Sequence, residues 1–445
     1  MSVLTDLRHS PMSRYQKLAI SIALLIVLID GYDLAVMSFA APALSLHWGI
    51  SDVQLGFLLS ASLFGMAAGS ILLTPLADRI GRRPLTMIAV AIISIGMIGS
   101  VLSPDEGWLF AARVITGFGI GGIAANLNVL VIELSSDKHH GLAMGLYGTG
   151  FPIGATICGF LARPLIPQFG WQSVFAVGAV ITVLMLVVAY RHLPESLEFL
   201  LTKRPPGALE KINATLRRMD RPPLDALPPV EHREADSGGI REIFTGVQAY
   251  RTILLWIGYG ALAAGYYFAN TWTPKIMATA TGDPSLGVTI GTIVNFGGII
   301  GSVAFGLLTI YIGVRSLLIG ILVAAGVSFL VFGLVMGQLG IALFVAAALG
   351  VLISAALLGF YTVSPRVYST RTRATGTGWM IGIGRLIAIV SPIVVGYLFA
   401  ARWSPDSVFF LYAIPLFASA TCIGALAISM RTRALASAAS RPTSA

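Results

Sequence analysis

The chain has 445 residues, of which 56% are apolar and only 11% are charged. Soluble proteins carry about 25% charged residues, and a soluble core cannot take up so much apolar sequence without leaving wide patches exposed. This composition excludes a soluble enzyme, a nucleic-acid-binding module and a disordered chain. The two cysteines, Cys158 and Cys422, lie in apolar segments, which excludes a disulfide scaffold and a cysteine-rich metal site.

Long apolar segments follow one another along the whole chain. About 20 apolar residues are needed for a helix to cross a bilayer. Twelve segments meet this requirement and predict an all-α integral membrane protein. The first is too long for a signal peptide and is not followed by a small-residue cleavage site, so we expect it to be retained. We expect the membrane spans at residues 18–44, 54–76, 85–103, 107–134, 142–165, 171–190, 252–276, 285–310, 315–336, 339–364, 374–400 and 406–430.

The basic residues predict the orientation in the membrane. The loops on the amino-terminal side hold 24 of the 29 lysine and arginine residues, because three lie in the opposite loops and two lie within spans. Loops rich in lysine and arginine stay in the cytoplasm. We therefore expect both termini to be cytoplasmic. The same bias explains the net charge of +9 without a nucleic acid partner.

A long polar segment divides the spans into two blocks of six. We expect an N-terminal bundle at residues 1–190, a cytoplasmic linker at 191–251, a C-terminal bundle at 252–430 and a disordered tail at 431–445. The linker is proline-rich and its charges nearly cancel, so a solvated linker is the simplest interpretation. The alternative is a short amphipathic surface helix near residues 209–219.

The two blocks also share a sequence pattern. Gly81 and Arg83 follow the second span, and Gly313 and Arg315 follow the eighth span 232 residues later. Two parallel six-helix repeats are typical of secondary transporters that move a substrate between two halves. The pattern therefore predicts two pseudo-symmetric bundles.

Two aspartates, Asp30 and Asp33, lie near the middle of the first span. A charged side chain at the bilayer centre costs about 2.5–3.5 kcal/mol on insertion scales, so it usually has a function. A spacing of three residues places both carboxylates on one helical face, where they cannot both ionise at low cost and should titrate together. This predicts proton coupling. The alternative is a fixed ion pair or the capping of an irregular turn at Gly31.

Three further charges lie within the spans, at Arg113, Glu133 and Arg385. Arg113 can neutralise an aspartate of the first span or contribute to substrate binding. Arg385 has no acidic candidate partner in the spans of the second block, and its planar guanidinium suits a carboxylate. We expect it to bind an anionic substrate, with a structural or gating role as the alternative. Glu133 is expected to form an interfacial ion pair.

Uncharged polar and aromatic residues give weaker signals. Asn126, Tyr32, Tyr266, Tyr361 and Trp379 are candidates for lining a substrate cavity, although such aromatic residues also serve in packing and as interfacial anchors. The glycines of residues 117–122 are expected to allow close helix packing. We find no metal-ligand cluster, catalytic arrangement or phosphate-binding loop, which predicts a protein that is not an enzyme and needs no cofactor.

Several motifs resemble a known family. The loop formed by Asp78, Arg79, Gly81, Arg82 and Arg83 resembles the signature between helices 2 and 3 of the major facilitator superfamily. In that superfamily the loop acts as a cytoplasmic gate, so the resemblance implies a gating loop here. Arg113 followed by spaced glycines resembles its helix 4 motif.

The resemblance extends to a subfamily, the aromatic acid:H+ symporters. Asp30-Gly-Tyr-Asp33 resembles the helix 1 signature of that family, and residues 373–385 resemble its helix 11. It implies a monomeric transporter in the bacterial cytoplasmic membrane that imports small aromatic carboxylates, of the hydroxybenzoate or protocatechuate type, together with protons. Without this resemblance, the residues indicate only a proton-linked transporter of an anion. The alternatives are a proton-coupled efflux antiporter for amphipathic compounds and an aromatic-acid sensor with little net transport.

Overall fold

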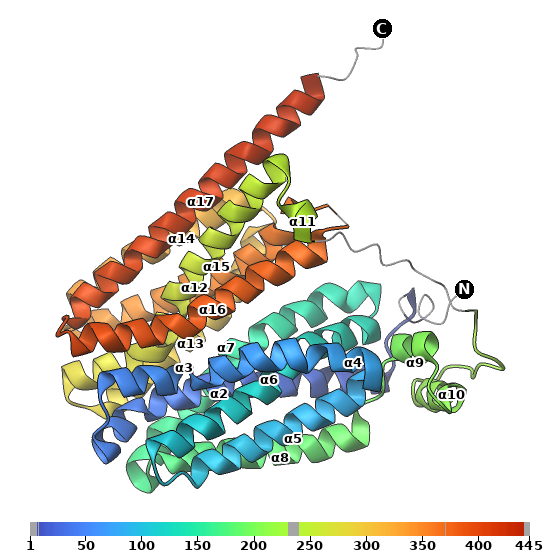
Figure 1. Cartoon of the computed structure of the whole chain (residues 1–445), viewed down its shortest axis with the longest axis horizontal. Coiled ribbons are helices and arrows are strands. Elements are labelled where there is room, and N and C mark those ends of the chain that lie inside the picture. Colours follow the sequence, from blue (N-terminus) through green and yellow to red (C-terminus); the bar gives the residue numbers. More distant parts are fainter. Residues whose placement is uncertain (1–6, 8, 230–239, 370, 440–445) are drawn as a thin grey trace. The chain divides into compact units, whose positions relative to one another are not determined.

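The computed structural model describes residue 7 and residues 9–229, 240–369 and 371–439. Every regular element in these residues is a helix (Figure 1). Within this part of the chain, twelve segments are long and apolar enough to cross a membrane. The predicted all-α membrane fold is therefore confirmed, with helix ends that differ from the expected spans by several residues.

The contacts divide the chain into two compact units, Met1–Glu234 and Ala235–Ala445. The helices of the N-terminal unit are α2 (Arg14–Trp48), α3 (Asp52–Leu72), α4 (Thr74–Ile80), α5 (Arg82–Val101), α6 (Glu106–Leu134), α7 (Asp137–Phe169), α8 (Gln172–His192), α9 (Leu197–Lys203) and α10 (Ala208–Arg218). Those of the C-terminal unit are α11 (Ile240–Ile243), α12 (Gly246–Thr281), α13 (Pro284–Leu308), α14 (Val314–Val335), α15 (Leu339–Val367), α16 (Arg373–Ala400) and α17 (Pro405–Ala439).

The same packing pattern occurs within each unit. In the N-terminal unit α2 packs against α7 and α8, α3 packs against α6, and α5 packs against α6 and α8. In the C-terminal unit α12 packs against α16 and α17, α13 packs against α15, and α14 packs against α15 and α17. The pairs correspond one to one in chain order. The repeat expected from the sequence is therefore present in the helix packing.

Short polar sequences begin and end the long helices. Ser13 Oγ accepts from the backbone N–H of Gln16, whose side chain accepts from Ser13 N–H in return. Ser51 and Gln54 repeat this reciprocal arrangement at the start of α3. Gly49, with a φ of 62°, ends α2 in the left-handed conformation that glycine adopts at low cost. The backbone groups at a helix end have no partner within the helix, and lipid cannot supply one. The capping residues meet this need at the ends of α2 and α3.

Glycines allow helix backbones to touch inside the N-terminal unit. A Cβ on Gly117 of α6 would lie 1.9 Å from the Ser62 carbonyl oxygen of α3, and a Cβ on Gly31 of α2 would lie 1.8 Å from the Phe151 carbonyl oxygen of α7. The packing role expected for the glycines of residues 117–122 is confirmed. The alternative of an irregular turn at Gly31 is wrong, because α2 continues through it as a helix.

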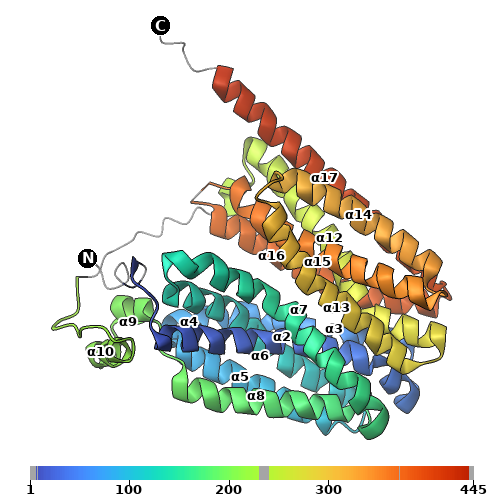
Figure 2. The ribbon, with the colours of Figure 1, turned by 180° about the vertical axis from the view of Figure 1, so that it is seen from behind.

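The first part of the predicted linker is folded. Residues 197–203 and 208–218 form α9 and α10, which lie beyond the ends of α5 and α8 (Figures 1 and 2). Ile212 and Leu216 of α10 are buried, and the side chain of Asn213 bonds both backbone groups of Leu224. The solvated-linker interpretation is therefore wrong for this stretch, and the amphipathic helix near residues 209–219 is present. Residues 230–239 lie outside the described residues.

The C-terminal tail also differs from the expectation. Residues 431–439 continue α17 as a helix to Ala439, where the alanine- and serine-rich sequence predicted disorder. Alanine is the residue with the highest helix propensity, so an existing helix extends readily through this composition. Residues 440–445 lie outside the described residues.

The contact between α2 and α7 predicts a position-specific effect of adding one methyl group. A Cβ at Gly154 would lie 1.9 Å from the Leu28 carbonyl oxygen, whereas a Cβ at Gly148 of the same helix meets no atom within 4 Å. We expect Gly154→Ala to lower stability by about 1–3 kcal/mol through overpacking, measured as the melting temperature in detergent. Gly148→Ala is the matched control and should melt no lower than wild type. Equal melting temperatures for all three proteins would contradict the close contact.

Candidate functional site

The most deeply buried charges of the N-terminal unit are Asp33 of α2 and Arg113 of α6. Arg113 Nη2 lies 2.6 Å from Asp33 Oδ2, and neither side chain has any exposed surface. The same nitrogen donates to the Asp33 backbone oxygen at 2.9 Å and to Ser62 Oγ at 2.7 Å. Ser62 Oγ in turn donates to Asp33 Oδ2 at 3.0 Å. Three helices, α2, α3 and α6, therefore meet at one hydrogen-bonded ion pair.

The surroundings of this pair are apolar and aromatic. The guanidinium carbon of Arg113 lies 5.5 Å from the ring centroid of Phe175, and Nη1 lies 3.8 Å from the sulfur of Met97. Within the described residues, Asp33 Oδ1 and Arg113 Nε are buried and have no hydrogen-bond partner. A buried polar atom without a partner is costly and is a feature of functional sites. Arg113 Nη2 and Asp33 Oδ2 are thus held by several contacts, whereas Arg113 Nε and Asp33 Oδ1 have no hydrogen-bond partner in the described part of the chain.

The structure separates the two predicted aspartates by environment. Asp33 is completely buried, whereas Asp30, one turn earlier in α2, is half-buried. The ion pair between Arg113 and a first-helix aspartate, one of the alternatives in the sequence, is present. Ser62 was missed, because a serine in an apolar span carries no signal until its helix neighbours are known.

The predicted gating loop forms a second polar cluster, at the ends of α5, α6 and α8. Glu195 Oε1 accepts from the backbone N–H groups of Arg82 at 2.7 Å and Arg83 at 3.1 Å. Arg82 also pairs with Glu133 at 3.5 Å and with Asp78 at 3.7 Å. The ion pair predicted for Glu133 is present, although its side chain is only 6% exposed.

Gly81 fits this cluster because of its backbone conformation. Its φ of 104° is unfavourable for other residues, and a Cβ there would lie 2.4 Å from Glu195 Oε2.

Arg83 Nη2 donates to the Tyr190 carbonyl oxygen at 2.6 Å. Arg79 is exposed. Glu195 was missed because it lies 113 residues from Arg82 and no sequence spacing connects them.

Two predicted cavity residues of the N-terminal unit serve as ties between helices. Asn126 Nδ2 donates to the Arg82 carbonyl oxygen and to Thr86 Oγ1, both at 2.8 Å. The Tyr32 hydroxyl donates to the Val174 carbonyl oxygen of α8 at 2.7 Å. Both polar groups are buried and bonded within the unit, so the structure shows each of them as a contact between helices. Sequence reasoning could not separate a polar tie from a substrate contact.

Arg385 of α16 lies beside aromatic residues of the C-terminal unit. It is half-buried, and it has no ion-pair partner among the described residues. The preceding residue, Gly384, packs against Tyr259 of α12, since a Cβ there would lie 2.2 Å from the ring. The Tyr259 hydroxyl lies 3.1 Å from that of Tyr361. Arg385 is thus a cation without an ion-pair partner among the described residues, within electrostatic range of the Tyr259 hydroxyl.

The remaining aromatic candidates lie in different environments. Tyr266 is buried against Tyr267. Trp379 is 50% exposed and stacks on Trp256 at 6.2 Å. Tyr259 was missed, because one tyrosine in an apolar span resembles any other until its neighbour Arg385 is placed beside it. No group of three metal-ligating side chains is found among the described residues.

Comparison with known proteins agrees with this architecture. A family model described as Major Facilitator Superfamily matches residues 23–280. The chain is 30% identical to the 4-hydroxybenzoate transporter PcaK of Pseudomonas aeruginosa, with 93% of each chain covered. It is 29% identical to the gallate transporter of Pseudomonas putida, with 93% of this chain and 92% of that protein covered. A partially occluded inward-open structure of the xylose transporter XylE from E. coli is similar in fold, with a TM-score of 0.71 at 18% identity over 92% of this chain and 97% of that chain.

In the described part of the chain, twelve helices long and apolar enough to cross a membrane form two six-helix repeats, and an ion pair is buried inside the first. These features define the class of secondary membrane transporters. Given the matching family model and these relatives, the chain belongs to the Major Facilitator Superfamily. It is accordingly a transporter and not an enzyme.

The Asp33–Arg113 pair predicts a strong coupling between the two side chains. Arg113→Gln leaves a carboxylate without its cation at a position with no exposed surface, which should cost about 3–5 kcal/mol of stability. The double variant Asp33→Asn/Arg113→Gln removes both charges and should recover part of that loss. Thermal unfolding of the two single variants, the double variant and wild type measures the coupling. Purely additive losses would show that the two side chains do not depend on each other.

Proposed function

We propose that this chain is a proton-coupled symporter that imports small aromatic carboxylates across the bacterial cytoplasmic membrane by alternating access. The observation that carries the proposal is the Asp33–Arg113 pair, because a completely buried carboxylate is held by one cation and has an oxygen without a donor among the described residues. Such intramembrane ionisable residues mark proton relays and substrate pathways.

The proton binds Asp33 at Oδ1, the oxygen without a hydrogen-bond partner in the described part of the chain. Protonation removes the negative charge that holds Arg113 Nη2 at 2.6 Å. The pair then weakens, and the contact between α2 and α6 is free to change. Asp30, one turn away and half-buried, connects Asp33 to the aqueous side. Both termini are cytoplasmic, and protons enter from the opposite side of the membrane.

The substrate class follows from the relatives together with Arg385. Proteins named as 4-hydroxybenzoate and gallate transporters align over more than 90% of this chain. The guanidinium of Arg385, which has no ion-pair partner among the described residues, binds the carboxylate of such acids. Tyr259 and Tyr361 pack against the ring and exchange hydrogen bonds with its hydroxyl groups.

The transport cycle requires that both cargoes change the conformational equilibrium. A ligand shifts such an equilibrium only by its difference in affinity for the two states. Proton and substrate therefore both favour the occluded state. The loop of Gly81, Arg82 and Arg83, held by Glu195, acts as a latch that must release during the cycle. A single chain contains both units and functions as a monomer.

Uptake into proteoliposomes tests the proposal. Radiolabelled 4-hydroxybenzoate, protocatechuate, gallate, benzoate and gentisate are offered separately under an imposed inward proton gradient, with and without a protonophore. At least one acid should accumulate above its external concentration, and the protonophore should abolish the accumulation. Binding without accumulation would instead indicate a sensor, and gradient-driven export of a preloaded amphipathic dye would indicate an efflux antiporter.

Asp33→Asn separates proton coupling from substrate binding in the same vesicles. Asparagine keeps the shape and the hydrogen-bond acceptor that faces Arg113 but cannot carry a proton. Gradient-driven accumulation should fall to the level reached without a gradient, while exchange of internal for external substrate continues. Asp52→Asn, at the start of α3, is the control for loss of one carboxylate outside the proposed proton route. Full accumulation by Asp33→Asn would exclude Asp33 as the proton carrier.

Arg385→Lys tests the substrate contact. Lysine keeps the positive charge but loses the planar fork, so KM for the acid should rise about ten-fold, the equivalent of about 1.4 kcal/mol, with a smaller change in the maximal rate. The matched control is Arg402→Lys, in the loop after α16. Initial uptake rates at varied substrate concentration measure both constants. An unchanged KM for Arg385→Lys would remove Arg385 from the substrate site.

A further inference from the structure

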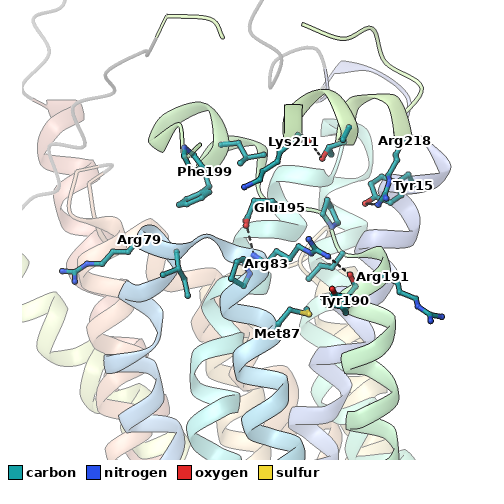
Figure 3. A pocket seen from close by; sticks show the side chains of 18 residues that line it. Tyr15, Arg79, Arg83, Met87, Tyr190, Arg191, Glu195, Phe199, Lys211 and Arg218 are labelled. Carbon is teal, nitrogen blue, oxygen red and sulfur yellow. Dashed lines mark hydrogen bonds between the residues drawn. The ribbon is translucent and has the colours of Figure 1, made fainter. Parts of the chain in front are cut away.

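A pocket of about 570 Å³ lies at one end of the N-terminal unit, between the ends of membrane-spanning helices and the short helices α9 and α10 (Figure 3). Its floor is formed by the start of α5 and the end of α8, and its outer wall by α9 and α10. Tyr15, Tyr190 and Phe199 contribute aromatic surface. The volume is in the range of small-molecule sites. The substrate and proton sites proposed above lie elsewhere in the chain, although Arg83 and Glu195 of the proposed latch are among the residues that line this pocket.

The pocket is strongly basic. Among the described residues that line it are five cations, Arg79, Arg83, Arg191, Lys211 and Arg218, and one carboxylate, Glu195. Glu195 Oε1 already accepts three backbone hydrogen bonds, from Arg82, Arg83 and Ser196. Its charge is therefore used to hold the loop between α4 and α5. The five cations therefore outnumber the acidic side chains among the described residues that line the pocket.

Two of the cations line the pocket from α10 and one from α5. Lys211 and Arg218 are seven residues apart on α10 and thus share one helical face, with Ala214 and Thr215 between them also lining the pocket. Figure 3 shows Lys211 pointing from α10 into the pocket, with Arg83 on the wall opposite, while Arg79 and Arg191 point away from the centre.

Two of these side chains are fixed by their neighbours. The Arg218 guanidinium lies over the Tyr15 ring at 5.6 Å and donates to the Tyr15 hydroxyl at 3.3 Å. Arg83 donates to the Tyr190 carbonyl oxygen and lies 5.7 Å from the centroid of its ring. A basic loop that served only to orient the chain in the membrane would need lysines and arginines, but not a hollow with positioned guanidinium groups.

We propose that this pocket binds a phosphate group, supplied by the headgroup of an anionic phospholipid in the adjoining leaflet. A phosphate presents several acceptor oxygens, which match two positioned guanidinium groups and one ammonium better than the two oxygens of a carboxylate do. The pocket lies where α5 begins at Arg82 and α8 ends at His192, the level at which headgroups lie and where basic clusters attract anionic lipid. Tyr15 and Tyr190 suit the same interfacial region.

Lipid binding to the purified full-length chain in detergent tests the proposal. Native mass spectrometry is used to titrate the protein with short-chain phosphatidylglycerol and, separately, phosphatidylcholine of the same chain length. Wild type should bind phosphatidylglycerol at least about ten-fold more tightly. Each basic residue near a membrane surface contributes about a five-fold factor, so Lys211→Gln/Arg218→Gln should weaken phosphatidylglycerol binding about 25-fold.

Two further double variants make this result specific. Lys203→Gln/Arg217→Gln removes the same charge from the same segment but from residues that do not line the pocket. Because solvent screens charges that do not contact the bound phosphate, this variant should stay within about two-fold of wild type. Lys211→Arg/Arg218→Lys retains the charge and should retain binding, which separates a lost site from a misfolded variant.

Three results would overturn the proposal. These are equal affinity for the two lipids, equal weakening by the two charge-removing variants, and full binding by Lys211→Gln/Arg218→Gln. Competition with glycerol 1-phosphate identifies the source of the phosphate group. If glycerol 1-phosphate displaces the lipid only at a concentration far above that of the lipid, the result supports a lipid headgroup as the source. Displacement at a concentration equal to that of the lipid would overturn the lipid as the source.

Discussion

The ion pair between Asp33 and Arg113 is the interaction on which the N-terminal unit depends. Taking two charges completely out of water is costly, and their attraction offsets that cost only when geometry and hydrogen bonds are good. Here one guanidinium nitrogen contacts the Asp33 carboxylate, the Asp33 backbone oxygen and the Ser62 hydroxyl within 2.9 Å. α2, α3 and α6 are therefore joined by a single group of polar contacts inside an apolar bundle.

The pair can exist only because the helices approach so closely. Gly117 lies one turn after Arg113 in α6, and it rests directly on the backbone of Ser62. A larger residue there would move α6 away from α3 and separate Ser62 from the guanidinium. In a membrane, where apolar burial between helices supplies little driving force, small residues and interhelical hydrogen bonds hold helices together. The close packing at Gly117 and the ion pair of Arg113 with Asp33 therefore depend on each other.

Polar groups in the N-terminal unit divide into two sets by their position along the helices. Near the middle of α2 is the buried pair, which we propose to respond to protons. At the ends of α5 and α8, Glu195 organises the backbone of Arg82 and Arg83, and the cations left over surround a pocket. One carboxylate that binds backbone N–H groups therefore has two effects, since it shapes the loop and leaves the neighbouring cations for another anion.

The sequence by itself determined the class of fold, the twelve spans, the repeat and the charges that lie within the spans, because length, hydropathy and the cost of a charge in lipid are local properties. It also found Asp33, Arg113 and Arg385 as exceptions in apolar segments. Only the tertiary structure decided which of them are partnered, and it showed Asn126 and Tyr32 as ties between helices and α10 as part of the N-terminal unit. Ser62, Tyr259 and Glu195 stayed hidden for the same physical reason: their roles come from neighbours distant in the chain, and helix packing alone brings those neighbours together.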